Sequence, residues 1–487
     1  MRISNLRYLL VVAFLFPLLA ASCGDKDDPI NRVVVEEPEE GVEVTTEMLV
    51  DLFAIGALEN YYLWSNEDGR DELVERVLNP LTCTDPINQF KKALHKDDRW
   101  SYLSDDYDAM LNSSKGVEVT DGIYVTPYIY GDDNDEVLFL VNFVYPGGPG
   151  EKAGVKRGDI FTQYNGSHMS TKTYKRYFDN EKQFTFGYGA IDTLNASIID
   201  TDKSVTLTPV EMYEEPVIAY KVFDTGEKKV GYFCYTSFVD NIDKMKEAFE
   251  LFTSQGVSEM ILDLRYNTGG LVPPSVALGS MLAPVSVVES EEILSKNVFN
   301  DAVSQIYTSM ITVRFDKSYV AYNPDVKKIY VLTGANTASA SEMVTTGLMP
   351  YTEIVTIGKK THGKFCSGIM INGKFVFHPD SWKELEPKIG NWGTYVMIGT
   401  YTNSKDENPC RPNGITPDIV LDDRAFAGIP LGDENEVLLH KALELAGMKF
   451  EEKAETRAAA PLPALEALPD ERPALTIFPA LGLPGKL

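Results

Sequence analysis

Residues 336–343, NTASASEM, combine hydroxyls with small side chains and place a glutamate where an apolar helix begins. A serine hydroxyl is a nucleophile in covalent catalysis when a neighbouring base removes its proton. A structural interpretation is equally direct, because Ser339 and Glu342 have the spacing of a capping box at a helix start. Alone, this segment favours a helix cap, so any chemistry has to be inferred from other segments.

Two further segments carry residue types suited to acyl transfer. DLRYNTGG, residues 263–270, follows an apolar strand and supplies glycines that a ligand backbone can approach closely. GKKTHGK, residues 358–364, follows another apolar strand and ends in Lys364. A lysine with its ordinary pKa of about 10.4 is protonated at neutral pH, so it becomes a base only where burial lowers that pKa.

The elements around these segments alternate between strand and helix. Apolar runs predict strands at 229–238, 258–264, 327–334 and 351–358. Helical periodicity predicts helices at 242–256 and from Ser341. This alternation predicts an α/β core of parallel strands joined by crossover helices.

A different pattern precedes this core. Two alternating runs, residues 122–130 and 136–145, are joined by GDDNDE, which lacks the glycine and the later glutamate of a calcium loop and is interpreted as a hairpin turn. Residues 146–166 then turn through glycines, predict a short helical element at 153–155 and end in the hairpin signal Asn165-Gly166.

This combination resembles the second half of a bacterial PDZ domain, which binds a peptide C-terminus as an added strand. The resemblance implies that the peptide-binding residues are Gly122, Ile123, Tyr124 and Val125.

The PDZ-like motif, the three segments above and GITPDIV at 414–420 together resemble the C-terminal processing peptidases of family S41. These are serine proteases with a Ser/Lys dyad on a crotonase-like (ClpP/crotonase-type) fold. The resemblance covers residues 46–425. It implies an α/β protease core, a PDZ domain and a small N-terminal helical domain.

The family's functional residues carry over onto matching positions. The resemblance makes Ser339 the nucleophile and Lys364, 25 residues further along, the general base. It makes the N–H of Ala340 and one from Gly269 or Gly270 the oxyanion hole.

The chain also departs from its relatives. Where some place an acidic residue and others a glutamine, this chain has Pro350 and Gly368, so the third catalytic member is not identified. His362 and Glu342 are interpreted as structural residues.

Composition limits the partners and the compartment. Asp and Glu outnumber Lys and Arg by 72 to 45, giving a net charge of −27 that repels nucleic acid. Arg2 and Arg7, an apolar run at 8–21 and small residues before Cys23 have the layout of a bacterial lipoprotein signal. We therefore expect a protein outside the cytoplasm, anchored to a membrane by a lipid on Cys23.

The predicted divisions are a signal peptide 1–22, an acidic tether 23–45 too polar to pack, a helical domain 46–115, a PDZ-like domain 116–213, a protease core 214–430, a terminal helix 431–452 and a disordered Pro/Ala-rich tail 453–487. One hypothesis is that this tail binds the chain's own peptide groove. No Cys or His spacing indicates a metal or a cofactor, and Cys366 and Cys410 either pair or remain free thiols.

The predicted function is a serine endopeptidase that cleaves polypeptides recognised through a C-terminal segment by the PDZ domain. Two alternatives remain open. One is a catalytically inactive peptide-binding or ligand-binding lipoprotein on the same fold, and the other is a structural surface lipoprotein.

Overall fold

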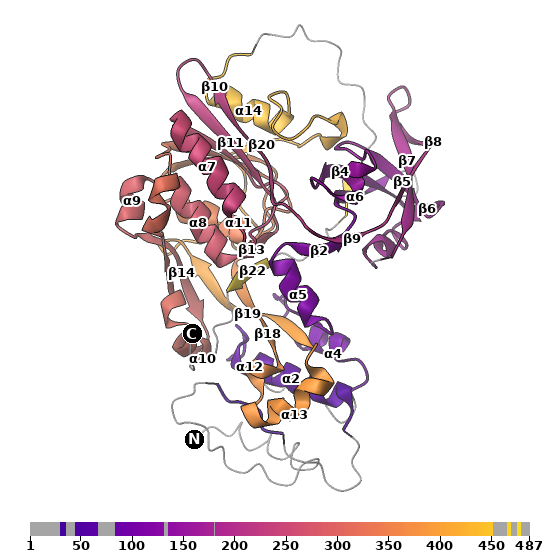
Figure 1. Cartoon of the computed structure of the whole chain (residues 1–487), viewed down its shortest axis with the longest axis vertical. Helices are drawn as coiled ribbons and strands as arrows, with labels where there is room; N and C mark the ends of the chain where they lie inside the picture. Colours follow the sequence, from indigo (N-terminus) through magenta and orange to yellow (C-terminus); the bar gives the residue numbers. More distant parts are fainter. Residues whose placement is uncertain are drawn as a thin grey trace.

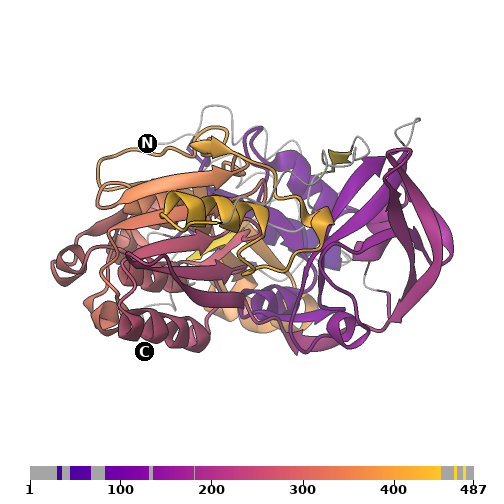
Figure 2. The same cartoon turned by 90° about the horizontal axis from the view of Figure 1, so that it is seen from above.

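The computed structural model describes residues 30–35, 44–66, 83–130, 135–179, 181–450, 465–468 and 475–478. Figure 1 shows three parts: a helical region at one end, two core sheets with their helices, and a separate sheet to one side. From above, this separate sheet lies beside the core sheets (Figure 2). None of the described helices is long and apolar enough to cross a membrane.

The first core sheet has the predicted crossover topology. Its strand order is β10 (Val217–Asp224), β11 (Lys229–Tyr235), β12 (Glu259–Asp263), β16 (Lys328–Thr333), β17 (Glu353–Gly358) and β20 (Ile419–Val420). From β11 to β20 all neighbouring strands are parallel, whereas β10 is antiparallel to β11. The α/β prediction is therefore confirmed.

Helices cover both faces of this sheet. One face packs on α14 (Val437–Leu445), and the opposite face belongs to the large hydrophobic core with α7 (Asp243–Gln255), α8 (Val272–Leu282) and α11 (Ala340–Leu348). The helix α7 ends where Gly256 adopts a left-handed conformation (φ 67°), which glycine allows without a steric cost.

The second core sheet is assembled from distant segments. Its order is β13 (Gly269–Leu271), β22 (Leu475–Phe478), β18 (Cys366–Asn372), β19 (Gly393–Thr402), β14 (Ile293–Phe299) and β15 (Thr312–Arg314), and β1 (Tyr102–Ser104) also pairs with β19. Beside it lie α10 (Asp301–Ile306), η2 (Thr308–Met310) and α12 (Gly373–Val376), and α13 (Pro379–Ile389) contacts α12. The short helix η3 (Lys317–Tyr322) contacts α7, α8 and α9 (Val285–Glu289).

The helical region consists of α2 (Thr46–Asn60), α4 (Pro86–Ala93) and α5 (Tyr107–Ser114). Side chains of Thr45, Asp85 and Asp106 cap the three helices by accepting backbone N–H groups. The buried residues of α2 belong to the same hydrophobic core as the core sheets, so this region is not a separately packed unit.

The separate sheet contains the PDZ-like motif. Its order is β21 (Glu466–Ala467), β3 (Ile123–Tyr130), β4 (Glu136–Val144), β6 (Ser167–Ser170), β5 (Ile160–Tyr164), β7 (Phe184–Asp192) and β8 (Ser197–Leu207), with α6 (Pro149–Lys152) and η1 (Tyr174–Phe178) beside it. A two-stranded ribbon, β2 (Val117–Thr120) with β9 (Val210–Tyr213), carries the chain into and out of it.

Two local predictions in this part can be compared directly. The Asn165-Gly166 hairpin is confirmed, because both residues have positive φ (50° and 76°) and join β5 to β6. The short helix lies one turn earlier than the predicted 153–155: it begins at Pro149, whose fixed φ suits a first helical position.

Residues 30–35 also differ from the expected polar tether. Ile30 is buried, and Val33 pairs with Phe377 between α12 and α13, where its N–H donates to the carbonyl of Val376 at 2.9 Å. The cysteines Cys83, Cys234, Cys366 and Cys410 are all buried free thiols, so Cys366 and Cys410 do not pair. The predicted signal peptide and Cys23 lie outside the described residues.

Candidate active site

Ser339 stands at the start of α11 in a strained backbone conformation. Its φ is 64° and its ψ is −114°, a region that costs a non-glycine residue about 1–3 kcal/mol. Several bonds hold it there: Met343 N–H donates to the carbonyl of Ser339 at 2.7 Å, and Ala338 N–H donates to that of Asn267 at 3.1 Å. The Ser339 side chain is buried, and its Oγ has no hydrogen-bond partner among the described residues.

Glu342 joins the first turn of α11 to the segment that carries Lys364. Its carboxylate accepts the N–H groups of Ser339 (2.8 Å), Gly363 (2.7 Å) and Lys364 (2.9 Å), as well as the Thr361 hydroxyl (2.6 Å). Burial raises the pKa of Glu342 to about 7, against the lowering effect of these bonds. Glu342 is thus a helix cap, as expected, and also a clamp between two distant segments.

Lys364 lies in the connection between β17 and β18 and is fully buried. Its Nζ donates to the hydroxyl of Tyr395 at 2.9 Å and lies 4.8 Å from the centre of that ring and 5.9 Å from that of Trp100. Burial lowers the pKa of Lys364 to about 8, against the opposing effects of Cys366, Asp98 and Glu342. The amine is thereby brought into the range in which it can act as a base.

A second connection between the two segments comes from Tyr401 on β19. Its hydroxyl donates to the carbonyl of Lys364 at 2.9 Å and lies 3.4 Å from that of Ser339. Sequence reasoning missed Tyr395 and Tyr401. The one signal in the sequence was their spacing: residues six apart in a strand lie on the same face, so the two tyrosines could be expected to point to the same side of the sheet.

The glycine segment after β12 supplies a strand beside Ser339's loop. Asn267 orders this segment: its Oδ1 accepts the N–H of Gly269 at 2.9 Å, and its Nδ2 donates to the carbonyl of Tyr235 at 3.0 Å. The N–H of Gly269 is therefore engaged, which leaves Gly270 as the better oxyanion donor of the two predicted. The N–H of Ala340, at the first position of α11, has no acceptor within the helix.

The structure also shows where Gly368 and Pro350 lie, the two residues at which this chain differs from the family pattern. Gly368 lies in β18, where a Cβ would come within 2.6 Å of the carbonyl of Val396, so no longer side chain fits. Pro350 lies in the turn after α11. The N–H of His362 donates to the carbonyl of Thr337 at 2.9 Å, and its ring lies 6.4 Å from that of Trp100.

Of the predicted peptide-binding residues, Ile123, Tyr124 and Val125 begin β3, and Gly122 directly precedes it. The N–H of Gly122 already donates to Thr120 Oγ1 (2.9 Å) and that of Ile123 to Asp121 Oδ1 (2.8 Å). These two amides are therefore engaged, contrary to what a free carboxylate-binding loop requires. The hydroxyl of Tyr124 accepts a bond from Asn336 Nδ2 at 3.0 Å, which joins β3 to the loop of Ser339.

A buried ionic cluster fastens the PDZ-like part to the glycine segment. Arg157 donates to the hydroxyl of Tyr266 at 2.6 Å and to the carbonyl of Asn142 at 2.7 Å, and pairs with Asp423. Burial alone would raise the pKa of Asp423, but the charges of Arg157 and Arg265 lower it overall. Tyr266 belongs to residues 263–270, so this cluster and the candidate oxyanion strand share one segment.

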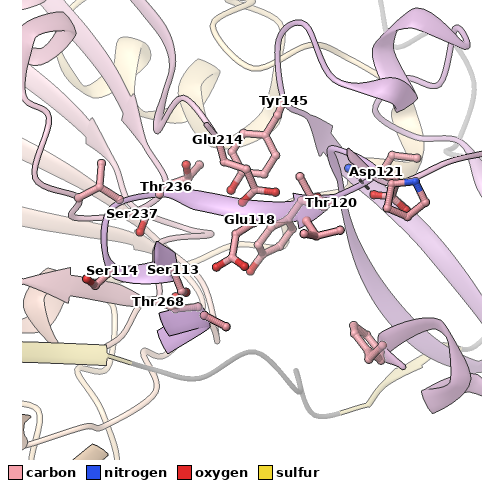
Figure 3. Close-up of a pocket in the computed structure, with 18 of the residues that line it drawn as sticks. Ser113, Ser114, Glu118, Thr120, Asp121, Tyr145, Glu214, Thr236, Ser237 and Thr268 are labelled. Atoms are coloured by element: carbon pink, nitrogen blue, oxygen red, sulfur yellow. Dashed lines mark hydrogen bonds between the residues drawn. The ribbon is translucent and has the colours of Figure 1, made fainter. Parts of the chain in front are cut away.

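A cavity of about 480 Å³ lies between these parts. It extends from Ile123, Tyr124 and Val125 on β3 to Gly269 and Gly270 on β13. Figure 3 shows the carboxylates of Glu118 and Glu214 directed into its centre. Its described lining also contains Asp106, Asp121 and Glu181 and has no Lys, Arg or His. Burial raises the pKa of Glu118. Neither Ser339 nor Lys364 lines the cavity.

Within the described part of the chain, no group of three or more His, Cys, Asp or Glu side chains is arranged to hold a metal ion.

Two segments of the chain match known protein families, and the chain is similar to several known proteins. Residues 229–421 match the model of peptidase family S41, and residues 140–185 match a PDZ domain model. The chloroplastic C-terminal processing peptidase of Tetradesmus obliquus is 25% identical over 266 residues, which are 53% of this chain and 53% of the relative. A CtpA-like serine protease of Staphylococcus aureus (strain N315) is 25% identical over 241 residues, 47% of this chain and 42% of the relative.

The chain thus spans about half the length of these two relatives. The solved structure of a chain from Bacteroides fragilis NCTC 9343 assigned to the S41 proteases superposes with a TM-score of 0.62 at 23% identity, covering 84% of this chain and 99% of that one. This likeness confirms the predicted protease-type fold.

Proposed function

Because residues 229–421 match the model of peptidase family S41 and residues 140–185 match a PDZ domain model, we propose that the chain is a serine endopeptidase in which Ser339 and Lys364 form the catalytic dyad. The observation that carries this proposal is the double connection between the two residues. The Glu342 carboxylate accepts both of their N–H groups, and the Tyr401 hydroxyl contacts both of their carbonyls.

The environment of each group supports a role in acyl transfer. The neutral amine of Lys364 takes the Ser339 proton as Oγ attacks the substrate carbonyl, and then delivers that proton to the leaving amine. The N–H groups of Ala340 and Gly270 are the proposed donors to the oxyanion. Water then hydrolyses the acyl-enzyme, with Lys364 again acting as the base. Tyr395 positions the amine through the 2.9 Å bond to Nζ.

The cavity supports recognition of polypeptides by the PDZ-like domain. It connects the start of β3, where a peptide can add as a strand, with the candidate oxyanion strand β13. A substrate C-terminal segment therefore binds along Ile123–Val125 of β3 while an upstream segment extends toward Gly270. Because the amides of Gly122 and Ile123 are engaged, strand addition contributes more than capture of the terminal carboxylate.

The test compares the purified wild-type protein with Ser339→Ala and Lys364→Ala. Each is incubated with an unfolded polypeptide that ends in apolar residues, and the products are identified by mass spectrometry. We expect cleavage by the wild type and a loss of at least about a thousandfold in both variants, because nucleophile and base act as one unit. Retained cleavage by pure, folded Ser339→Ala protein would refute the proposal.

The N-terminal sequence supports a location for the protein in the cell. We propose that the chain acts outside the cytoplasm, anchored to a membrane by a lipid on Cys23. Cys23→Ala should abolish incorporation of a labelled fatty acid and release the protein from the membrane fraction. A membrane-bound Cys23→Ala variant would rule out this anchor.

A further inference from the structure

The end of the chain supplies an interior strand of the second core sheet. The strand β22 is hydrogen-bonded between β13 and β18 and is parallel to both. Its register places Thr476 opposite Gly270, and Ile477 opposite both Leu271 and Gly368. Figure 1 shows β22 beside β13 and β18 although it is drawn in the yellow of the C-terminal end.

The backbone of β13 shows which groups face this strand. Phe238 N–H donates to the carbonyl of Gly269 at 2.9 Å, and Leu271 N–H donates to the carbonyl of Phe238 at 2.7 Å. Since successive N–H groups of a strand point to opposite sides, the N–H of Gly270 is directed toward β22. The tail backbone thus lies against the group proposed as an oxyanion donor.

An upstream part of the same tail contacts the PDZ-like sheet. The strand β21 pairs antiparallel with β3 at Tyr128 and Ile129, and Leu468 N–H donates to the carbonyl of Pro127 at 3.0 Å. The side chains of Leu465 and Leu468 pack against the hydrophobic residues of that sheet. The same tail therefore lies along one edge of the PDZ-like sheet through β21, and between β13 and β18 through β22. We call the space between β13 and β18 the slot.

In this arrangement a substrate cannot reach Ser339 or Lys364. Ser339 and Lys364 are both 0% exposed, and the cavity stops at Gly269 and Gly270 without reaching either. A polypeptide substrate needs its main chain beside Gly270 and its carbonyl at Ser339. The slot that it would use is the one between β13 and β18, which β22 fills.

We infer that the C-terminal tail is an intramolecular ligand that occupies the substrate slot through β22 and the β3 edge through β21, and thereby inhibits the peptidase. This inference rests on the proposed function. An attached ligand acts at an effective concentration of about millimolar, so a short strand with modest intrinsic affinity suffices to keep the slot filled. A polypeptide that reaches Gly270 competes with β22, and one whose pairing with β3 extends from Val125 to Tyr128 also competes with β21, which couples recognition to activation.

The experiment uses the full chain with Ile477→Pro. Proline lacks an N–H and is excluded from interior strands, so this substitution disrupts β22. Ala480→Pro, which adds the same residue just beyond β22, is the matched control. Circular dichroism melts establish that both variants are folded. Hydrogen exchange of the amides in β13 and β18 then reports whether the slot has been vacated.

Binding and turnover are measured separately. In the Ser339→Ala background, a fluorescent synthetic peptide with the sequence of residues 463–487 should bind Ile477→Pro at least about tenfold more tightly than the unsubstituted tail or Ala480→Pro. In the Ser339 background, Ile477→Pro should cleave an unfolded polypeptide at least about tenfold faster. Equal exchange and equal peptide affinity in all three chains would overturn the inference. Faster exchange and tighter binding with no cleavage would support the tail contact and refute the peptidase.

Discussion

At the scale of single residues, Lys364 has the two properties that a lysine base requires. Its burial favours the neutral amine, and its position is fixed by the bond to Tyr395. The Trp100 ring lies 5.9 Å from the Nζ, within the range of a cation–π contact, so the charged amine that the proposed proton transfer forms keeps some stabilisation. We therefore expect the pocket to accommodate both protonation states.

The rate of cleavage should rise with pH and level off above about pH 8. The neutral fraction of Lys364 grows as the pH passes its lowered pKa of about 8, whereas an ordinary lysine would give a midpoint near 10.4. The measurement is kcat/KM between pH 5.5 and 10. A midpoint near 10 would contradict a buried base.

Tyr395→Phe is the corresponding control, because it keeps the ring and removes the hydroxyl acceptor. Losing that acceptor disfavours the charged amine, so the midpoint should move to lower pH and the plateau should fall about tenfold.

The pH dependence of folding stability gives an independent check on the pKa of Lys364. Lys364 has a lower pKa in the folded protein than in the unfolded chain, so between about pH 8 and 10.5 the unfolded chain binds more protons and stability rises with pH. Lys364→Ala should lose this slope.

At the scale of elements, the first turn of α11 organises the site through one side chain. A carboxylate at the start of a helix is favoured by the helix dipole, yet Glu342 also accepts bonds from the connection before β18. It therefore fixes the relative positions of α11 and Lys364. Its pKa of about 7 means that acidification weakens this contact close to neutral pH.

Glu342→Gln should reduce stability and activity together. The amide keeps one acceptor oxygen but directs donor hydrogens at N–H groups that need acceptors, and a buried unsatisfied group costs about 1–3 kcal/mol. We expect a lower melting temperature and a loss of activity at pH 8. Glu384→Gln, which alters an exposed carboxylate on α13, is the control and should change neither quantity. Equal melting temperatures for the two variants would contradict the clamp.

Local patterns were enough to predict several of the elements around the candidate site. The crossover strands, the cap at Glu342 and the glycines of residues 263–270 all have short-range signals, and the crossover strands and the cap are confirmed. Tyr395 and Tyr401 could not be predicted, because they reach the dyad through the pairing of β18 with β19, and register between strands is not encoded in either strand alone. The tail strands were missed because a Pro/Ala-rich composition predicts disorder, although β22 occupies four of the five residues between Pro473 and Pro479.

At the scale of the whole molecule, the cavity joins three regions. The strand β2, Pro209 and Glu214 on either side of β9, the start of β3 and the strand β13 all contribute to its lining, so a bound polypeptide would contact the PDZ-like and core parts together. Its carboxylates give it a negative potential in a partly enclosed space, where charges interact more strongly than at an open surface. We therefore expect the lining to favour bound segments that carry positive charge.

Substrates with lysine in the segment that crosses the cavity should be cleaved faster than matched substrates with glutamate, by about tenfold at low salt. The measurement is the ratio of kcat/KM for the two peptides. Replacing both Glu118 and Glu214 by Gln should reduce this ratio, as should added salt. Glu353→Gln, on the exposed side of β17, serves as the control. An unchanged ratio in the double variant would show that the cavity does not carry the selectivity.

The interior position of β22 has a consequence for encounters between molecules. When this strand leaves, β13 and β18 both become sheet edges with unpaired N–H and C=O groups, which are the usual templates for intermolecular pairing. A second copy carries the same terminal strand and satisfies these groups equally well. Reciprocal exchange of two tails closes a two-fold pair without any new surface, so concentrated solutions of this chain have a direct route to swapped dimers.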